Sequence, residues 1–344
     1  EMLEAGFTRV GEFHYLHHDP AGAPYADPAE MADAIVAARA ASGIGLTLLP
    51  VYYAHGNFGG SAPAPGQRRF LSGIDGFAAL FDATRGKLSG DDLIGVAPHS
   101  LRAVTPEELG ALLALSPAGP VHIHAAEQVK EVEDCVAWSG ARPVEWLLAN
   151  AGVDARWCLV HATHLTSAET HALAGSGAVA GLCPVTEANL GDGIFPAVEY
   201  LAAGGRFGIG TDSNILIDAA QELRTLEYSQ RLARRARALL AGADIPFVGA
   251  HLFARALHGG AQALGVTGGL GVGAVADMVS LDLDHPAFAG ADEATLLDRW
   301  IFAARAGAID CVWRAGAKRV AAGRHLEADA IARAYRSCLA RLLA

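Results

Sequence analysis

Short apolar segments alternate with helix-like segments along most of this chain. Seven of them have the length and composition of buried strands: residues 8–15, 44–53, 93–99, 121–125, 157–162, 178–184 and 206–212. The stretches between them are long enough for the helical crossovers that parallel neighbouring strands require. This alternation predicts a parallel arrangement of strands covered by helices.

Local signals mark where some of the intervening helices begin and end. Asp27 is placed to cap a helix that ends at Gly43, because short polar residues favour the first position and glycine the last. Thr105 and Glu108 have the spacing of a capping box. Residues 221–242 also read as one long helix.

Four ionisable residues stand at the carboxyl ends of four different predicted strands: His99, His124, His161 and Asp212. In a closed barrel of eight parallel strands, these ends meet at one face, where active sites form. Any one of them alone is most simply a hydrogen-bonded loop residue, but four together favour a functional site. Since only seven strands are predicted, either the sheet is open or one strand lies outside this chain.

The residue pattern changes after Gly265. Residues 268–284 read as turn, strand, turn and strand, and residues 309–324 as a β-hairpin. An amphipathic helix over residues 329–344 closes the chain.

We therefore expect two units. Residues 1–265 would form a catalytic barrel domain that lacks its N-terminal strand, and residues 266–344 the C-terminal part of a small β-sandwich domain with its closing helix. The chain opens on Glu1 rather than on methionine, so we expect a further segment before it.

Composition narrows the class of protein. The 344 residues are 52% hydrophobic, which is enough for a large core, and the net charge of −11 comes without a basic cluster, which argues against nucleic acid as a partner. The 5 cysteines are far apart and form no CxxC pair, which favours reduced thiols in a cytoplasmic protein. Uninterrupted apolar runs stay below the roughly 20 residues that a membrane helix needs.

Several motifs at the predicted strand ends resemble those of the metal-dependent amidohydrolase superfamily. The motifs are HIHAAE (122–127), VHATHL (160–165), CPVTEANLGDG (183–193) and GIGTDSN (208–214). They are similar to the fifth to eighth barrel strands of that superfamily, and GLGVGAVADMVSLD (269–282) is similar to its return to a small β-sandwich. The resemblance implies a TIM-like (β/α)8 barrel, its first strand missing here, with a β-sandwich-type second domain.

Three other segments narrow the resemblance. GEFHYLHHDPAG (11–22), VYYAHGNFGGSAPAPGQRRF (51–70) and VAPHSLRAV (96–104) are similar to the formimidoylglutamate deiminases, which are hydrolases acting on the C–N bonds of linear amidines. That likeness implies hydrolytic deimination of N-formimino-L-glutamate to N-formyl-L-glutamate and ammonia in histidine degradation.

Members of that family bind their metal partly through an HxH pair on the first strand. The one HxH pair here is His122 and His124, and Glu127, His161 and Asp212 follow it in the order that matches the fifth strand. The resemblance thus implies that His124 and Asp212 hold one divalent metal per chain, with zinc expected before iron. His122 is expected to be a packed, hydrogen-bonded residue deeper in the barrel.

The resemblance also implies catalytic roles. Glu127 would deliver a proton to the departing nitrogen, and Asp212 would accept one from water. His161 would polarise the substrate, with a second metal ligand or a residue behind the ligands as the alternatives.

The substrate implied is a small dianion derived from an amino acid, so its site needs donors for two carboxylates. Arg102 is the strongest candidate because a guanidinium can bind a carboxylate through two nitrogens, although a surface arginine at a helix start is the alternative. By resemblance, Tyr15 and His99 join it. The roles of six further residues stay open: His14, His17, His18, His55, Arg68 and Arg69.

Two competing hypotheses remain at this stage. An aromatic-base deaminase of the guanine or cytosine type would keep the fold and the metal but would need stacking aromatics and few positive charges. A metal-free barrel without catalytic activity would explain the missing first-strand HxH pair. Enzymes of this type are often homodimers, and no stretch of the sequence specifies that assembly.

Overall fold

The structure of this chain is a computed structural model, and it describes residues 1–213, 215–305 and 307–344. Its parallel strands are β1 (Arg9–His14), β2 (Gly45–Tyr52), β3 (Leu93–Ile94), β4 (Ala97–Pro98), β5 (Val121–Ala125), β6 (Trp157–His161), β7 (Val179–Leu182) and β8 (Arg206–Ile209). Each lies within a segment that the sequence predicts as a strand, and every pairing among them is parallel. The predicted parallel arrangement is therefore confirmed.

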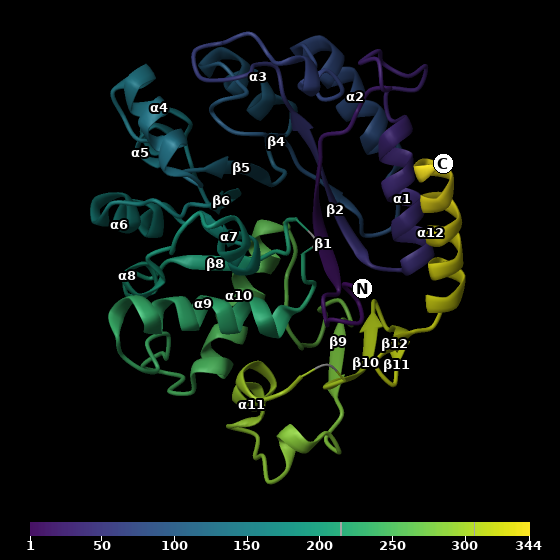
Figure 1. Cartoon of the computed structure of the whole chain (residues 1–344), viewed down its shortest axis with the longest axis vertical. Coiled ribbons are helices and arrows are strands. Elements are labelled where there is room, and N and C mark those ends of the chain that lie inside the picture. The colour runs from purple at the N-terminus through teal and green to yellow at the C-terminus, as the bar shows by residue number, and fades with distance from the viewer. Residues whose placement is uncertain (214, 306) are drawn as a thin grey trace.

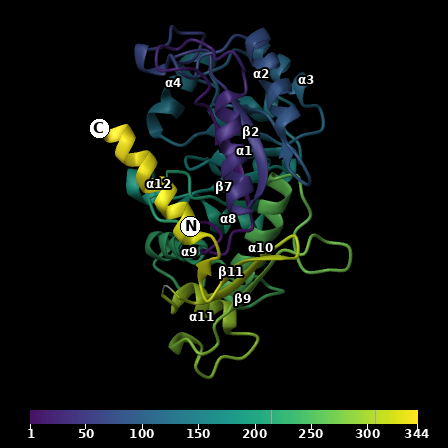
Figure 2. The same cartoon turned by 90° about the vertical axis from the view of Figure 1, so that its right-hand side faces the viewer.

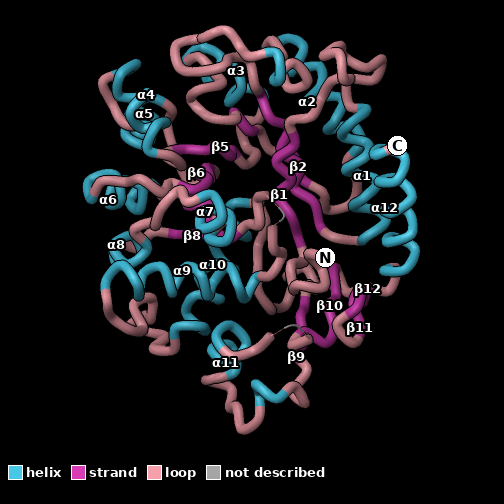
Figure 3. Tube along the Cα trace, viewed as in Figure 1, coloured by secondary structure: helices cyan, strands magenta, loops and turns pink. Residues whose placement is uncertain are grey.

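These strands form two sheets, one of β1–β4 and one of β5–β8 (Figure 3). The sheets meet through two parallel bridges, Val96 with Val121 and Ser100 with His124. Within the described residues, β1 pairs only with β2 and β8 only with β7. The structure thus shows a mixed α/β fold with parallel strands and, among the described residues, no closed barrel, whereas the sequence predicts a (β/α)8-type barrel that lacks its first strand.

Helices follow the strands and lie outside them (Figure 1). They are α1 (Glu30–Ser42), α2 (Ile74–Lys87), α3 (Pro106–Leu115), α4 (Val129–Ser139), α5 (Pro143–Asn150), α6 (Ser167–Ser176), α7 (Pro184–Leu190), α8 (Ala197–Ala202), α9 (Ala219–Arg234), α10 (Val248–Ala263), α11 (Leu296–Phe302) and α12 (Ala328–Leu343), with 3-10 turns η1 (Pro65–Gln67) and η2 (Pro286–Phe288). The predicted capping box of α3 is present, since the Thr105 hydroxyl accepts the Glu108 amide and the Glu108 carboxylate accepts the Thr105 amide. Trp157, Tyr52 and Phe77 are among the largest fully buried side chains between helices and strands.

Two predicted helix boundaries were wrong. α1 begins at Glu30, because the Asp27 carboxylate instead accepts the Ala29 amide at 2.9 Å and caps the preceding turn. α9 ends at Arg234, well before residue 242, although apolar and basic residues continue the helical pattern. The reason is the buried Glu227 carboxylate, which accepts the amides of residues 239 and 240 and so folds the chain back on the helix.

Helix α10 fixes the last parallel strand. A side chain at Gly259 would lie 2.0 Å from the Phe207 carbonyl oxygen of β8, so only glycine allows this close approach. At the C-terminal end of α10, the Ala263 carbonyl oxygen lies 2.7 Å from His122 Nε2. His122 is buried there, which confirms its predicted structural role.

A small antiparallel sheet follows, in the order β12-β11-β10-β9, and comprises β9 (Met278–Leu281), β10 (Ile309–Arg314), β11 (Ala317–Ala321) and β12 (Arg324–His325). The predicted hairpin is confirmed, with Ala315 and Gly316 both at positive φ, as a tight two-residue turn requires. Residues 268–284 hold the one strand β9 instead of the predicted two. This stretch is rich in glycine, which disfavours extended pairing.

The small sheet is tied to the parallel strands by charged side chains. Arg314 of β10 and Arg9 of β1 both bind the Asp91 carboxylate before β3. The closing helix α12 forms as predicted and has no buried residue (Figures 1 and 2). In the part of the chain that the structure describes, no helix combines the length and the apolar character needed to span a bilayer.

Candidate functional site

Three histidine rings from neighbouring strands stand in a row. His99 follows β4, His124 lies in β5 and His161 ends β6. The ring centroids of His99 and His124 are 5.0 Å apart, and those of His124 and His161 are 5.4 Å apart. The structure therefore brings together the strand-end residues that the sequence singled out.

The backbone around these residues is strained. His161, Ala162 and Asp212 have positive φ angles of 66°, 48° and 46°, and Ala126 just after β5 has 54°. Histidine and aspartate tolerate this left-handed region better than most residues, whereas alanine rarely adopts it. Such conformations cluster at functional sites, where the surrounding structure holds them in place.

Hydrogen bonds define the tautomers of two of the rings. His124 Nδ1 lies 3.0 Å from the His99 carbonyl oxygen, and His161 Nδ1 lies 3.2 Å from Glu187 Oε1. A carbonyl oxygen or an ionised carboxylate can only accept, so each Nδ1 must donate. This arrangement leaves the Nε2 atom of both rings available for the site.

The Nε2 atom of His161 faces two carboxylates. It lies 3.8 Å from Glu127 Oε1 and 3.8 Å from Asp212 Oδ2, and it is buried without a hydrogen-bond partner among the described residues. Burial lowers the pKa of His161, but its hydrogen bond to Glu187 and the charges of Glu127, Glu187 and Asp212 together outweigh burial and raise that pKa. The ring is thus held in a strongly acidic surrounding.

Glu127 has the environment of a proton-transfer group. Burial raises the pKa of its carboxyl above the usual range, and Asp192 and Glu131 add to the rise against the charges of His161 and Arg102. The buried Glu131 carboxylate accepts the amides of Ala126 and Glu127 at 3.1 and 3.0 Å. Sequence reasoning missed Glu131, although an acidic residue in the first turn of α4 was a signal for such a cap.

A group of potential metal donors surrounds the same point. Ligand atoms of His161, Cys183 and Asp212 all lie within 4.8 Å of one another. Sequence reasoning took Cys183 only as a buried thiol, although it directly follows β7 and so stands at a strand end like the others. Burial raises the pKa of that thiol far above its usual range.

The residues present fit a bound divalent metal. A metal-binding imidazole normally donates its second ring N–H to a carbonyl or carboxylate, as His124 and His161 both do here. Burial, and then the neighbouring His99 and His161, hold the pKa of His124 well below its usual value, so its Nε2 lone pair is free to coordinate. Imidazole nitrogen with carboxylate oxygen is a donor set that zinc accepts.

The opposite side of the site has a cationic and aromatic character. The Nε atom of Arg102 is buried without a hydrogen-bond partner among the described residues. Burial and the charge of Arg102 lower the pKa of His99 to about 3, so the His99 ring is neutral at physiological pH. Tyr15 is 40% exposed and lies beside Phe70, with ring centroids 4.9 Å apart.

Tyr53 completes this side, and sequence reasoning missed it. Its ring lies edge-on to His99, with centroids 4.7 Å apart. Its hydroxyl oxygen accepts the Gln67 side-chain amide at 2.7 Å, which leaves the hydroxyl hydrogen available to a ligand. The signal was its position directly after β2, the same kind of strand end that holds His99.

The residues that the sequence left open mostly serve the loops. His17, His18, Arg68 and Arg69 donate to backbone carbonyls of Val51, Leu71, Pro20 and His18, respectively. His55 pairs with Glu108 at 2.9 Å. His14 is buried, and burial lowers its pKa to about 4. The paired arginines therefore help to hold the loop through these hydrogen bonds.

A model of the amidohydrolase family matches residues 1–318. This chain belongs to the amidohydrolase family. It is 52% identical to the formimidoylglutamate deiminase of Pseudomonas aeruginosa, over 100% of this chain and 76% of that protein. The family assignment agrees with the superfamily resemblance that the strand-end motifs carry.

Two solved amidohydrolase-like structures support the fold. A crystal structure of an amidohydrolase from Brucella melitensis superimposes with a TM-score of 0.95 at 56% identity, over 100% of this chain and 76% of that one. An adenosine deaminase from Xanthomonas campestris with bound zinc has a TM-score of 0.78 at 26% identity, over 99% and 73% of the two chains. Amidohydrolases bind a divalent metal, and the donor set described above is consistent with that property.

Proposed function

We propose that this amidohydrolase is a formimidoylglutamate deiminase, which hydrolyses N-formimino-L-glutamate to N-formyl-L-glutamate and ammonia in histidine degradation. The single observation that carries the proposal is the 52% identity to a formimidoylglutamate deiminase over the whole chain. The site supports it, because Arg102 Nε, which has no hydrogen-bond partner among the described residues, accompanies the Glu127, His161 and Asp212 cluster. In this proposal residues 1–265 form the catalytic unit and residues 266–344 the small second one.

Recognition would fall to the aromatic and cationic side. Arg102 binds one carboxylate of the substrate through two nitrogens, which a guanidinium does better than an ammonium. Tyr15 donates its hydroxyl, and His99 acts as a neutral hydrogen-bonding ring because its pKa is about 3. These groups suit a flexible dianion.

Proton transfer would fall to the acidic side. Asp212 accepts a proton from the attacking water, and Glu127 gives a proton to the nitrogen that leaves as ammonia. His161 polarises the formimino group through Nε2 and stabilises the tetrahedral intermediate that forms when water attacks. A divalent metal, zinc in our proposal with iron as the alternative, would be held by His124 and Asp212 and would supply a water acidic near pH 7.

An aromatic-base deaminase is the second candidate, because the Xanthomonas adenosine deaminase shares the fold. The half-buried guanidinium of Arg102 argues against it, since a neutral flat base offers no anionic partner for this cation. The identity to that protein is also lower, 26% against 52%.

Both proposals are tested by measuring the ammonia that the purified protein releases from each candidate substrate. We expect release from N-formimino-L-glutamate and little from adenosine, guanine or cytosine. N-formiminoglycine, which lacks the side-chain carboxylate, is expected to react much more slowly. Release from a base but not from formiminoglutamate would reverse the assignment, and release from none would favour a barrel without catalytic activity.

A further inference from the structure

Glu187 of α7 has no part in the roles assigned above, yet it contacts the site directly. Its side chain is buried, and its Oε1 atom accepts the Cys183 amide at 2.9 Å and His161 Nδ1 at 3.2 Å. One carboxylate oxygen thus joins the turn after β7 to the ring at the end of β6.

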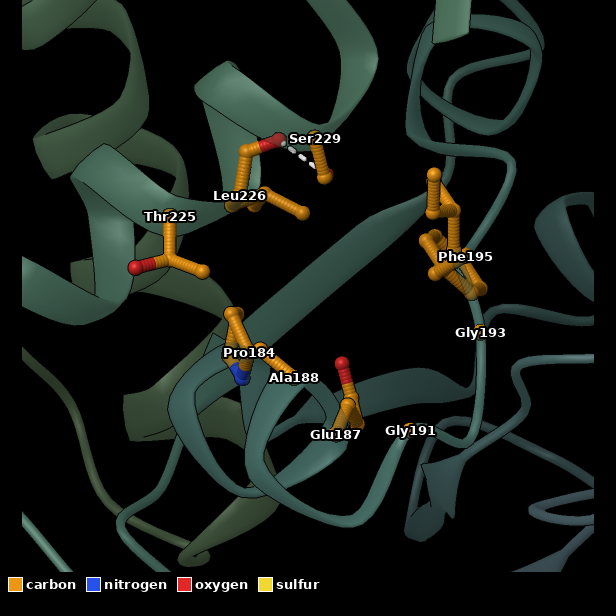
Figure 4. A pocket seen from close by; sticks show the side chains of 10 residues that line it. Pro184, Glu187, Ala188, Gly191, Gly193, Phe195, Thr225, Leu226 and Ser229 are labelled. Carbon is orange, nitrogen blue, oxygen red and sulfur yellow. Dashed lines mark hydrogen bonds between the residues drawn. The ribbon is translucent and has the colours of Figure 1, made fainter. Parts of the chain in front are cut away.

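The surroundings of Glu187 on its other side do not require a carboxylate. A cavity of about 230 Å³ lies there, lined by Ile194, Phe195, Leu226 and small or polar residues. Figure 4 shows the Glu187 side chain directed into this cavity, with Thr225, Leu226 and Ser229 of α9 across from it. An apolar side chain would fill this space at lower cost, because a buried carboxylate loses its hydration.

We propose that Glu187 is a positioning residue for His161. Its Oε1 atom holds the imidazole in the Nδ1–H tautomer and fixes the ring plane, so that Nε2 stays between Glu127 Oε1 and Asp212 Oδ2. Without an acceptor at Nδ1, the ring would exchange tautomers and rotate about its Cβ–Cγ bond. This role rests on the proposed deiminase function for its kinetic consequence, but the orientation of the ring does not depend on it.

The test compares Glu187→Met, which has a similar shape but no acceptor, with Glu187→Gln. The Cys183 amide should hold the glutamine carbonyl oxygen at the Oε1 position, so Glu187→Gln keeps an acceptor for His161. We expect Glu187→Met to lower kcat for formiminoglutamate about 10- to 100-fold, the usual cost of removing such a partner. KM and zinc content should stay close to those of the wild type, and Glu187→Gln should recover most of kcat.

Thr225→Val is the matched control, because Thr225 lines the same cavity without contacting His161. It should leave kcat and KM unchanged. Wild-type kcat in Glu187→Met would overturn the proposal, as would a loss of kcat that is explained by a parallel loss of zinc. Should Glu187→Met fail to fold, Glu187→Asp, whose shorter carboxylate cannot reach Nδ1, should lose kcat in the same way, and wild-type kcat there overturns the proposal.

Nitrogen-15 NMR of the histidine rings separates this proposal from the function it rests on. The His161 signals, assigned with His161→Asn, should show a protonated Nδ1 in the wild type and in Glu187→Gln, and a changed tautomer in Glu187→Met. This readout holds even if formiminoglutamate is not the substrate. Identical His161 signals in Glu187→Met and in the wild type would rule out the positioning role. Absent turnover of formiminoglutamate by the wild type would rule out only the deiminase assignment.

Discussion

The two sheets of parallel strands contribute opposite kinds of side chain to the site. The β1–β4 sheet is followed by Tyr15, Tyr53, His99 and Arg102, which are aromatic, neutral or cationic. The His99 ring is kept uncharged, since burial lowers its pKa to about 3. This side can recognise an anion but has few groups that exchange protons near neutral pH.

The β5–β8 sheet supplies acids instead. Burial raises the pKa of Glu127, and it raises the pKa of Glu222, behind the site, to about 8. The pKa of His161, which lies among carboxylates, is also raised. Under the proposed function, binding and proton transfer fall to different sheets, so substitutions on the two sheets should change different kinetic constants.

The largest effect is expected on the acidic side, from Glu127→Gln. The amide cannot deliver a proton to the departing nitrogen, and general acid–base groups typically contribute about 10²- to 10⁴-fold to the rate. We expect kcat to fall by that factor while zinc content, measured by elemental analysis, stays unchanged. Glu133→Gln, at an exposed position of α4, is the control, and near-normal turnover in Glu127→Gln would contradict the proposed role of Glu127.

Arg102→Met should produce the opposite kinetic signature. A hydrogen bond to a charged group contributes about 1.5–3 kcal/mol, so we expect KM for formiminoglutamate to rise roughly 10- to 100-fold with a much smaller change in kcat. Arg85→Met, which removes an exposed arginine paired with Asp82, serves as the control. An unchanged KM in Arg102→Met would show that the carboxylate binds elsewhere.

Glu222→Gln tests the acidic side through stability. The folded carboxyl, with a pKa of about 8, holds a proton that the unfolded chain releases near 4.5, so the folded state binds more protons between these values. The free energy of unfolding of the wild type should therefore fall as pH rises from about 5 to 8, and Glu222→Gln should remove that part of the slope. The melting temperatures of the wild type and of Glu222→Gln should differ by a few degrees more at pH 8 than at pH 5. The same pH dependence in both proteins would count against the raised pKa.

The smallest effect is expected from Thr105→Ala on the recognition side. Loss of the N-cap of α3 costs about 1 kcal/mol, which corresponds to roughly 1–2 °C in Tm for a chain of this size. Thr105→Ser keeps the hydroxyl and should behave like the wild type. A change in kcat larger than the change in KM would contradict the proposed division of binding and proton transfer between the two sheets.

The positions of the site residues could be predicted from the sequence because strand ends are local features. Apolar runs that stop at His99, His124 or His161 identify both the strand and the residue at its end. The partners behind them could not be predicted, since Glu131 and Glu187 lie on helices, where a glutamate normally faces solvent. The contact between His161 and Glu187 spans 26 residues of sequence and arises only when β6 and β7 pair.

The start of α1 and the end of α9 were missed for the same kind of reason. Buried Glu227 terminates α9 by binding amides beyond it, and no local propensity encodes that contact. By contrast, the unpaired edges of β1 and β8 among the described residues agree with the sequence, which predicts seven strands for a barrel of eight.

The left-handed residues beside the site bear on how this enzyme can be re-engineered. A saturation library at His161 and Asp212 should return mostly asparagine, aspartate, histidine and glycine among folded members, since β-branched side chains clash at positive φ. Ala126 and Ala162 offer the reverse opportunity, because glycine there removes backbone strain. The geometry thus limits which new chemistries are reachable by single substitutions, before any question of substrate fit arises.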